Sequence, residues 1–310
     1  MYTLDNRPPH GLVQQSGFKD TLTTLHDSET GWPIKFFKVP CSILLQDDLT
    51  YKNGVILELE KYKEHYGNDI DQVTFYTEHR NLKNLYPNLN LVYFPWFLYD
   101  HLVDTKKWHV DEMFEFNDTH EFVFMCLNRN LRAHRDKALS ILQNFPSRLL
   151  SYQARNWQLY GHDDWNMDYY RDFELGRSGE DIKTNTANLI QLKSVYNKCQ
   201  FSVVAETRYD LPFDFYTEKT TQCFLALHPA LYVSNKGHVK LLREYGFDMF
   251  DDVFDNSYDD MSDDVRLNYM IESNREVLTN GIPDFHKLKN RLIANRNHFL
   301  DTTSPIFKCV

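Results

Sequence analysis

The sequence predicts an α/β protein with two domains, each built around a mainly parallel sheet. The chain has 310 residues, which fits two domains of roughly 100 to 200 residues each. Short apolar runs alternate with stretches of helical periodicity, which is the pattern of a doubly wound sheet. The alternation stops in a polar segment, residues 104–119, and then restarts. We therefore place one domain at residues 1–112, a second at 113–283 and a final helical segment at 284–310.

The first domain begins with a segment, residues 1–33, that shows no clean periodicity and contains RPPHG, so we expect an irregular arm. The apolar run CSILLQDDL predicts the first strand at 41–49. Apolar residues at helical spacing then predict a helix at 54–66. The remaining predicted elements are a strand at 72–79 (QVTFYTEH), a short helix at 80–87 that Pro87 ends, and a strand at 89–102 (LNLVYFPWFLYDHL).

The second domain repeats the alternation. The run HEFVFMCLNRN predicts its first strand, and the following AHRDKALSILQNF has apolar residues at i, i+3, i+4 and i+7, which predicts an amphipathic helix. The runs QFSVVAET and ALYVSN predict two strands on either side of a helix that opens with Thr-Glu-Lys. Residues 150–193 are expected to be mostly loop. The remaining predicted helices are 238–245, ended by Gly246 as a left-handed cap, 265–278 and 284–300.

Composition limits the functional classes. The formal net charge of −10 argues against a protein whose main task is to bind nucleic-acid phosphates. No run approaches the roughly 20 apolar residues of a membrane span, and the N-terminus does not resemble a signal peptide, so we expect a soluble, cytoplasmic protein. The five cysteines form no CxxC pair, so neither a zinc site nor a disulfide framework is indicated.

Three polar clusters follow the predicted strands of the second domain. Ligands of open α/β sheets bind outside the carboxyl ends of the strands, and a helix N-terminus there favours phosphate. Carboxylates beside such a site suit the two hydroxyls of a ribose. The sequence therefore predicts a nucleoside diphosphate site, although each residue alone could be an ordinary surface or capping residue. The clusters are Asn128, Arg129, Arg132 and Arg135; Glu206, Thr207 and Arg208; and Thr217, Glu218 and Lys219.

The run FSVVAETRYDLPFDFYTEKTTQCFLALHPALYVSNKG carries a resemblance to a known family. It resembles the donor-binding motif of the GDP-fucose-dependent α1,3-fucosyltransferases and related GT-B glycosyltransferases. That family has a strand ending in Phe-Glu-Asn, then Tyr-Val-Thr-Glu-Lys opening a helix, and then a Pro-Val-Val-Gly segment. Here VVAET, FYTEKT and HPALYVSN take these places, with Thr207 where the family has Asn and PALYVSNKG in place of the last segment.

The resemblance implies roles for individual residues. Glu218 would bind the ribose hydroxyls, Lys219 the diphosphate, and Glu206 the sugar or its surroundings. An arginine after the domain's first strand, Arg129 or Arg132, would hold a phosphate. Thr217 opens the matching motif and belongs to the same predicted donor site.

The implied protein has a GT-B-like fold, with two Rossmann-like domains facing across a cleft. It would transfer a hexose, fucose or another, from a GDP- or UDP-linked donor to a hydroxyl of a glycan or other acceptor. Neither metal nor cofactor is needed, because Lys, Arg and the helix dipole can neutralise the leaving diphosphate. In an inverting reaction a base of the first domain deprotonates the acceptor. We favour Glu78 or His79 and also name Asp48; Asp47, Asp100 and His101 are further candidates.

Other functions stay open at this point. One is a metal-dependent GT-A-type transferase that uses Asp163 and Asp164, or Asp251 and Asp252; the second pair lies in an acidic run that can equally be a solvated loop. Another is a non-catalytic module that binds a nucleotide or glycan. A third is sugar transfer to modified DNA bases, which would need a locally basic cleft.

Overall fold

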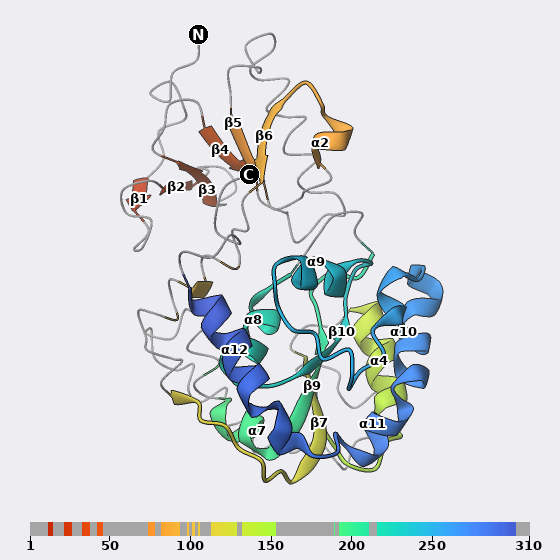
Figure 1. Ribbon diagram of the computed structural model, residues 1–310. Coiled ribbons are helices and arrows are strands. Elements are labelled where there is room, and N and C mark those ends of the chain that lie inside the picture. Colours follow the sequence, from red (N-terminus) through yellow and green to blue (C-terminus); the bar gives the residue numbers. More distant parts are fainter. Residues whose placement is uncertain are drawn as a thin grey trace, which may run out of the picture. The chain divides into compact units, whose positions relative to one another are not determined.

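Figure 1 shows the protein as a computed structural model. The chain divides into two compact units, Met1–Trp96 with Ile306–Val310, and Phe97–Pro305, which we describe separately. Both predicted domain boundaries, after residues 112 and 283, fall within the second unit and stay predictions. The structure describes the backbone of residues 12–14, 22–26, 33–37, 42–45, 74–77 and 151–152, and residues 82–93, 98, 101–102, 105, 113–128, 132–150, 189, 192–210 and 216–301 in full.

The first unit contains a six-stranded mixed sheet with the strand order β1-β2-β3-β4-β5-β6. Neighbouring strands from β1 to β4 are antiparallel, and β4, β5 and β6 are parallel. Only part of this sheet therefore has the predicted parallel character. The strands are β1 (Leu12–Gln14), β2 (Leu22–His26), β3 (Pro33–Phe37), β4 (Ser42–Leu45), β5 (Thr74–Thr77) and β6 (Asn90–Tyr93).

The predicted strands β4 and β5 are confirmed, as is the short helix α2 (Leu82–Leu85). The strand predicted at 89–102 is confirmed as β6 but is wrong at its end, where Leu98, His101 and Leu102 are helical. The helix ends before Pro87 because residues preceding proline disfavour helical backbone angles. The expectation of an irregular N-terminal arm is wrong, since β1 and β2 lie within it. Strands of three and five residues are too short to show a clear period of two in the sequence. The helix predicted at 54–66 lies outside the described residues.

The second unit contains a four-stranded sheet with the order β10-β9-β7-β8, and all of its neighbours are parallel. Its α/β character is as predicted. Every residue of β10 is buried, as expected for a parallel strand covered on both faces. The strands are β7 (Phe122–Asn128), β8 (Arg148–Tyr152), β9 (Cys199–Ala205) and β10 (Ala230–Val233); β8 was not predicted.

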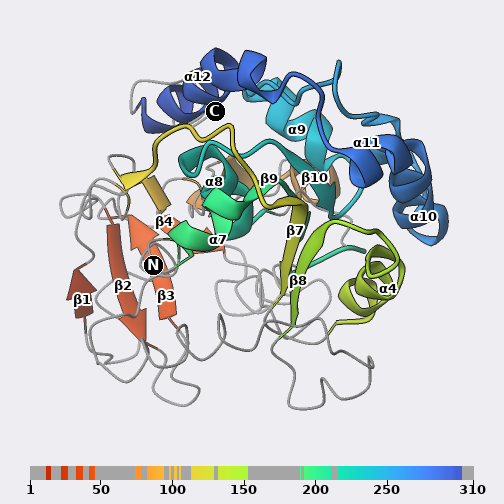
Figure 2. The same ribbon diagram turned by 90° about the horizontal axis from the view of Figure 1, so that it is seen from below.

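Helices cover both faces of this sheet (Figures 1 and 2). On one side lie α7 (Lys193–Lys198), α8 (Glu218–Leu225) and α12 (Lys289–Leu300), and on the other lies α4 (Ala133–Leu142). The last helix, α12, packs on α8, where the rings of Phe299 and Phe224 are 6.3 Å apart. No described helix is long and apolar enough to cross a membrane.

The C-terminal part adds helices in nearly the predicted places. The left-handed cap at Gly246 after α9 (His238–Glu244) is confirmed, with φ of +95°. The helix predicted at 265–278 is interrupted at Asn274, whose side-chain amide donates to the carbonyl of Asp255 and accepts from its N–H, both at 2.9 Å. A side chain that bonds the backbone in this way competes with helix continuation. The elements are η6 (Ser257–Asp260), α10 (Asp263–Ser273), α11 (Arg275–Asn280) and η7 (Phe285–Leu288).

The strand order indicates where a ligand is expected to bind at this sheet. From β7 the chain moves outward to β8 on one side, then returns to β9 on the other side and continues to β10. The direction therefore reverses between β7 and β9. In open parallel sheets, ligands bind outside the carboxyl ends of the strands at such a switch point.

Candidate functional site

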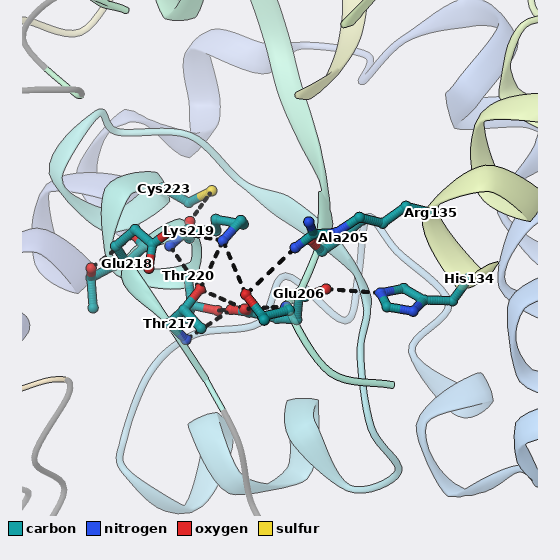
Figure 3. A network of polar contacts seen from close by, with 11 residues as sticks. His134, Arg135, Ala205, Glu206, Thr217, Glu218, Lys219, Thr220 and Cys223 are labelled. Atoms are coloured by element: carbon teal, nitrogen blue, oxygen red, sulfur yellow. Dashed lines mark hydrogen bonds and ion pairs between the residues drawn. The ribbon is translucent and has the colours of Figure 1, made fainter. Parts of the chain in front are cut away.

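Hydrogen bonds connect the first turn of α4 to the end of β9 across the switch point (Figure 3). The His134 Nε2–H donates to the carbonyl of Glu206 at 2.9 Å, and the buried Arg135 guanidinium donates to the carbonyl of Ala205 at 3.2 Å. Burial lowers the pKa of His134 to about 4, although the carbonyl bond acts in the opposite direction. Sequence reasoning missed His134, whose position at the start of a predicted helix was the available signal.

The carboxylate of Glu206 is the centre of a buried polar network. The residue has no exposed surface, and its oxygens accept from four donors. These are the Thr217 hydroxyl at 2.6 Å, the Thr220 hydroxyl at 2.6 Å, the Thr217 N–H at 3.1 Å and the Thr207 N–H at 3.2 Å. A carboxylate has about four lone-pair sites, so this one is fully used. Glu206 therefore joins the end of β9 to the start of α8.

Thr217 caps α8. Its backbone is extended, with φ of −130°, and its hydroxyl oxygen accepts from the Lys219 N–H at 3.4 Å. A threonine cap of this kind satisfies one of the helix's unpaired donors. The sequence predicted this helix start, and Figure 3 shows Thr217 against Glu206, with Lys219 beside Glu218 in the first turn.

The Lys219 ammonium contacts three acceptors. It lies 2.8 Å from Glu218 Oε1, 3.3 Å from Thr217 Oγ1 and 3.4 Å from Thr207 Oγ1. An ammonium has three donors, so all of them are engaged. The two hydroxyl contacts are long, and a bound anion could replace them. The side chain is 20% exposed, which leaves it within reach of a ligand.

Glu218 is held in its ionised form. Burial raises the pKa of this carboxyl, but Lys219 and the buried His101 lower it, and the net pKa is about 2. An ionised carboxylate only accepts hydrogen bonds. With 22% of its side chain exposed, Glu218 can accept from a ligand's hydroxyl groups.

Positive charges gather at the start of α4. Burial lowers the pKa of the Arg132 guanidinium, and the nearby Arg208 lowers it further. Arg135 carries a third guanidinium of the group, which Arg132 also affects. Among the described residues, nothing accepts a hydrogen bond from the buried Nε of Arg132. Like charges brought together in this way repel, and an anion between them would relieve the repulsion.

The helix starts at this edge differ in how they are capped. Thr217 caps α8, and the Asp259 carboxylate accepts from the first N–H groups of α9, those of Val239 and Lys240, at 3.0 and 2.8 Å. Within the described part of the chain, no side chain caps α4, which begins after Arg132. Among the described residues, the start of α4 therefore combines N–H groups that no side chain caps with adjacent guanidinium groups.

Most of the remaining predicted site residues are not described by the structure. Arg129, Glu78, His79 and Asp48 lie outside the described residues, as do Asp47 and Asp100. His101, the other candidate base, lies close enough to Glu218 to lower its pKa. Of the predicted donor-site residues, the structure therefore brings together Glu206, Thr217, Glu218 and Lys219, with Arg132 at the neighbouring helix start.

The acidic run contains aspartates that pair with arginines. Asp251 accepts from Arg243 at 2.8 Å, and Asp252 accepts from Arg291 at 2.7 Å. In the described part of the chain, no three His, Cys, Asp or Glu side chains are grouped as metal ligands. Asp163 and Asp164 lie outside the described residues.

No protein-family model, curated protein or solved structure matches this chain.

Proposed function

We propose that the switch-point edge of the second unit binds a nucleoside diphosphate sugar, and that the protein is a GT-B-like glycosyltransferase. It transfers a hexose to an acceptor hydroxyl without a metal, in the cytoplasm. The observation that carries this proposal is the cluster of guanidinium groups beside the uncapped start of α4, in a chain whose net charge is −10. The Glu206 carboxylate near Arg135 offsets part of the repulsion within this cluster, and a bound diphosphate would offset it further.

The phosphates are bound by charge and by backbone donors. Arg132 and the start of α4, which no described side chain caps, lie at the switch point, and a helix start of this kind favours phosphate. Lys219 approaches from α8 and exchanges its long hydroxyl contacts for phosphate oxygens. Arg129 is a further phosphate ligand in this proposal.

The ribose is bound by Glu218. Its carboxylate is ionised and partly exposed, so it accepts hydrogen bonds from the two ribose hydroxyls. Glu206 has a different role because four donors already occupy its oxygens. It acts on the ligand through Thr217, whose position it fixes.

In the transfer step, the bond between the anomeric carbon and the diphosphate oxygen breaks while the acceptor oxygen bonds to that carbon. The diphosphate leaves with the electron pair, and Lys219 and the arginines stabilise its charge. The acceptor loses its proton to a base, for which Glu78, His79 and Asp48 stay the predicted residues.

A ligand screen tests the donor site. We expect one of GDP, UDP, CMP, ADP or dTDP to raise the melting temperature, because a ligand that binds only the folded state stabilises it by mass action. The shift should be the same with and without Mg²⁺. A shift that needs Mg²⁺ would favour the metal-dependent transferase, and no shift with any of the five would contradict the donor site. Binding without sugar transfer would favour the non-catalytic module.

A further inference from the structure

A buried histidine lies behind the Thr-Glu-Lys junction. His238 is the first residue of α9 and is 1% exposed. Its Nε2 lies 3.3 Å from the hydroxyl of Thr220, a fully buried residue in the first turn of α8. This contact connects two helix starts at the carboxyl edge of the sheet.

The number of protons on Thr220 fixes the direction of this hydrogen bond. A threonine hydroxyl has one proton, and that of Thr220 is donated to Glu206 Oε1 at 2.6 Å. Thr220 must therefore accept from His238, so the proton of the imidazole is on Nε2. The result is a chain of donors from His238 to Thr220 to Glu206.

The same carboxylate holds the capping residue of α8. Glu206 accepts from both the N–H and the hydroxyl of Thr217, and the Thr217 hydroxyl contacts the Lys219 ammonium. His238 is thus connected to Lys219 through hydrogen bonds. It reaches that ammonium from inside the protein, where no ligand would touch it.

His238 is itself held in place by its neighbours. Asp259 accepts from the N–H groups of Val239 and Lys240, and its carbonyl accepts from the Gly237 N–H at 3.0 Å. The imidazole packs against the ring of Tyr232 in β10, with ring centres 4.8 Å apart. A side chain held in this way can keep its hydrogen-bond partner, Thr220, in a fixed position.

We propose that His238 is a positioning residue of the donor site. By donating to Thr220 it fixes Glu206, and Glu206 fixes Thr217 and Lys219 for contact with the diphosphate. This inference rests on the proposed function, since it assumes that the junction binds a nucleoside diphosphate. It adds that diphosphate binding depends on a buried residue that does not contact the ligand.

The test compares two substitutions at one position. In His238→Gln, the amide nitrogen stands close to the place of Nε2 and keeps the donor, whereas His238→Leu removes it. We expect His238→Leu to bind the diphosphate about tenfold more weakly, the factor for roughly one hydrogen bond. His238→Gln should stay within about threefold of the original protein. The measurement is titration calorimetry with GDP and with UDP.

Thr220→Val breaks the same chain at its middle and should cause a similar loss. If His238 acts through Thr220, adding His238→Leu to Thr220→Val should weaken binding no further, because the two changes remove one connection. Ser202→Ala is the matched control, since it removes another buried hydroxyl that contacts a histidine, His228, at 2.9 Å. It should leave the affinity unchanged.

The outcomes separate the inference from the proposed function. If the original protein binds neither GDP nor UDP, nor any other nucleoside diphosphate, the proposed function fails. If it binds one of them and His238→Leu and Thr220→Val bind equally well, only the inference fails. Additive losses in the double variant would also overturn the inference, because His238 would then act by another route. Should His238→Leu not fold, His238→Met takes its place as a variant without a side-chain donor at this position, with the same expected loss.

Discussion

The four-stranded sheet has an amino edge, formed by the amino ends of its strands, and a carboxyl edge, formed by their carboxyl ends. These two edges use polar residues in different ways. At the amino edge, Lys198 and Glu121 form an exposed ion pair at 3.0 Å, and Gln200 exchanges two hydrogen bonds with the backbone of Ile282. At the carboxyl edge, guanidinium groups lie near one another, and a fully buried carboxylate, Glu206, organises the loops.

The difference supports the carboxyl edge as the candidate functional site. The exposed ion pair contributes little to stability, and the glutamine simply joins two chain segments. Bringing several guanidinium groups together at one edge costs free energy, which the Glu206 carboxylate near Arg135 offsets in part. Departures of this kind are expected at functional sites.

The largest expected effect is on stability, from removing the acceptor at the carboxyl edge. Glu206→Gln replaces one oxygen by an NH₂ group that cannot accept, so two of the four bonds are lost. We expect the free energy of unfolding to fall by about 3 to 6 kcal/mol, from about 1.5 to 3 for each of the two bonds to a charged group. Urea denaturation measures it. Glu121→Gln at the amino edge should change stability by less than about 1 kcal/mol. Equal effects at the two edges would remove the contrast.

A second prediction concerns acid. His228 is buried, its Nε2–H donates to the Tyr196 carbonyl at 2.8 Å, and burial lowers its pKa to about 4. The unfolded chain protonates this group near its ordinary value of 6.5, so it binds more protons than the folded state between pH 6.5 and 4. The stabilisation is therefore complete above pH 6.5 and is lost as the pH falls toward 4, by at most roughly 3 kcal/mol.

Urea denaturation at several pH values checks this acid effect. In His228→Gln the loss of stability between pH 6.5 and 4 should be smaller than in the original protein. The exposed His286 supplies the control variant, His286→Gln, which should keep the original pH dependence. An unchanged pH dependence in His228→Gln would contradict the assignment to His228.

The smallest predicted effect is on ligand affinity. Lys219→Ala should weaken binding of the diphosphate by about 1.5 to 3 kcal/mol, the scale for losing a hydrogen bond to a charged group. Lys198→Ala removes a lysine that also pairs with a neighbouring glutamate, but at the amino edge, and should leave affinity unchanged. Calorimetric titration of both variants compares the edges directly. Equal losses, or none in either, would exclude Lys219 as a ligand contact.

The elements of the second unit were predictable from the sequence where their residues are mostly buried. The residues of β10 are all buried, so their apolar run is visible in the sequence, and the Thr-Glu-Lys residues mark a helix start. The interruption at Asn274 was not predictable, because it depends on a partner 19 residues away, Asp255. A sequence pattern contains no information on such a long-range hydrogen bond.

The candidate site was predictable in its residues but not in their roles. The position of Glu206 after a strand and the motif of Glu218 and Lys219 pointed to the carboxyl edge. Only the structure shows that the oxygens of Glu206 are fully used and that Thr220 and His238 support them. Spacing along the chain cannot show how many hydrogen bonds one side chain has already made.

The anchoring of the chain to Glu206 has a consequence for sequence change. Thr207 and Thr217 both donate to its carboxylate, so the stretch between them starts and finishes on one side chain. Closing a longer loop costs little entropy, only about 0.6 kcal/mol for each doubling of its length. Insertions in this stretch can therefore accumulate while Lys219 keeps its place.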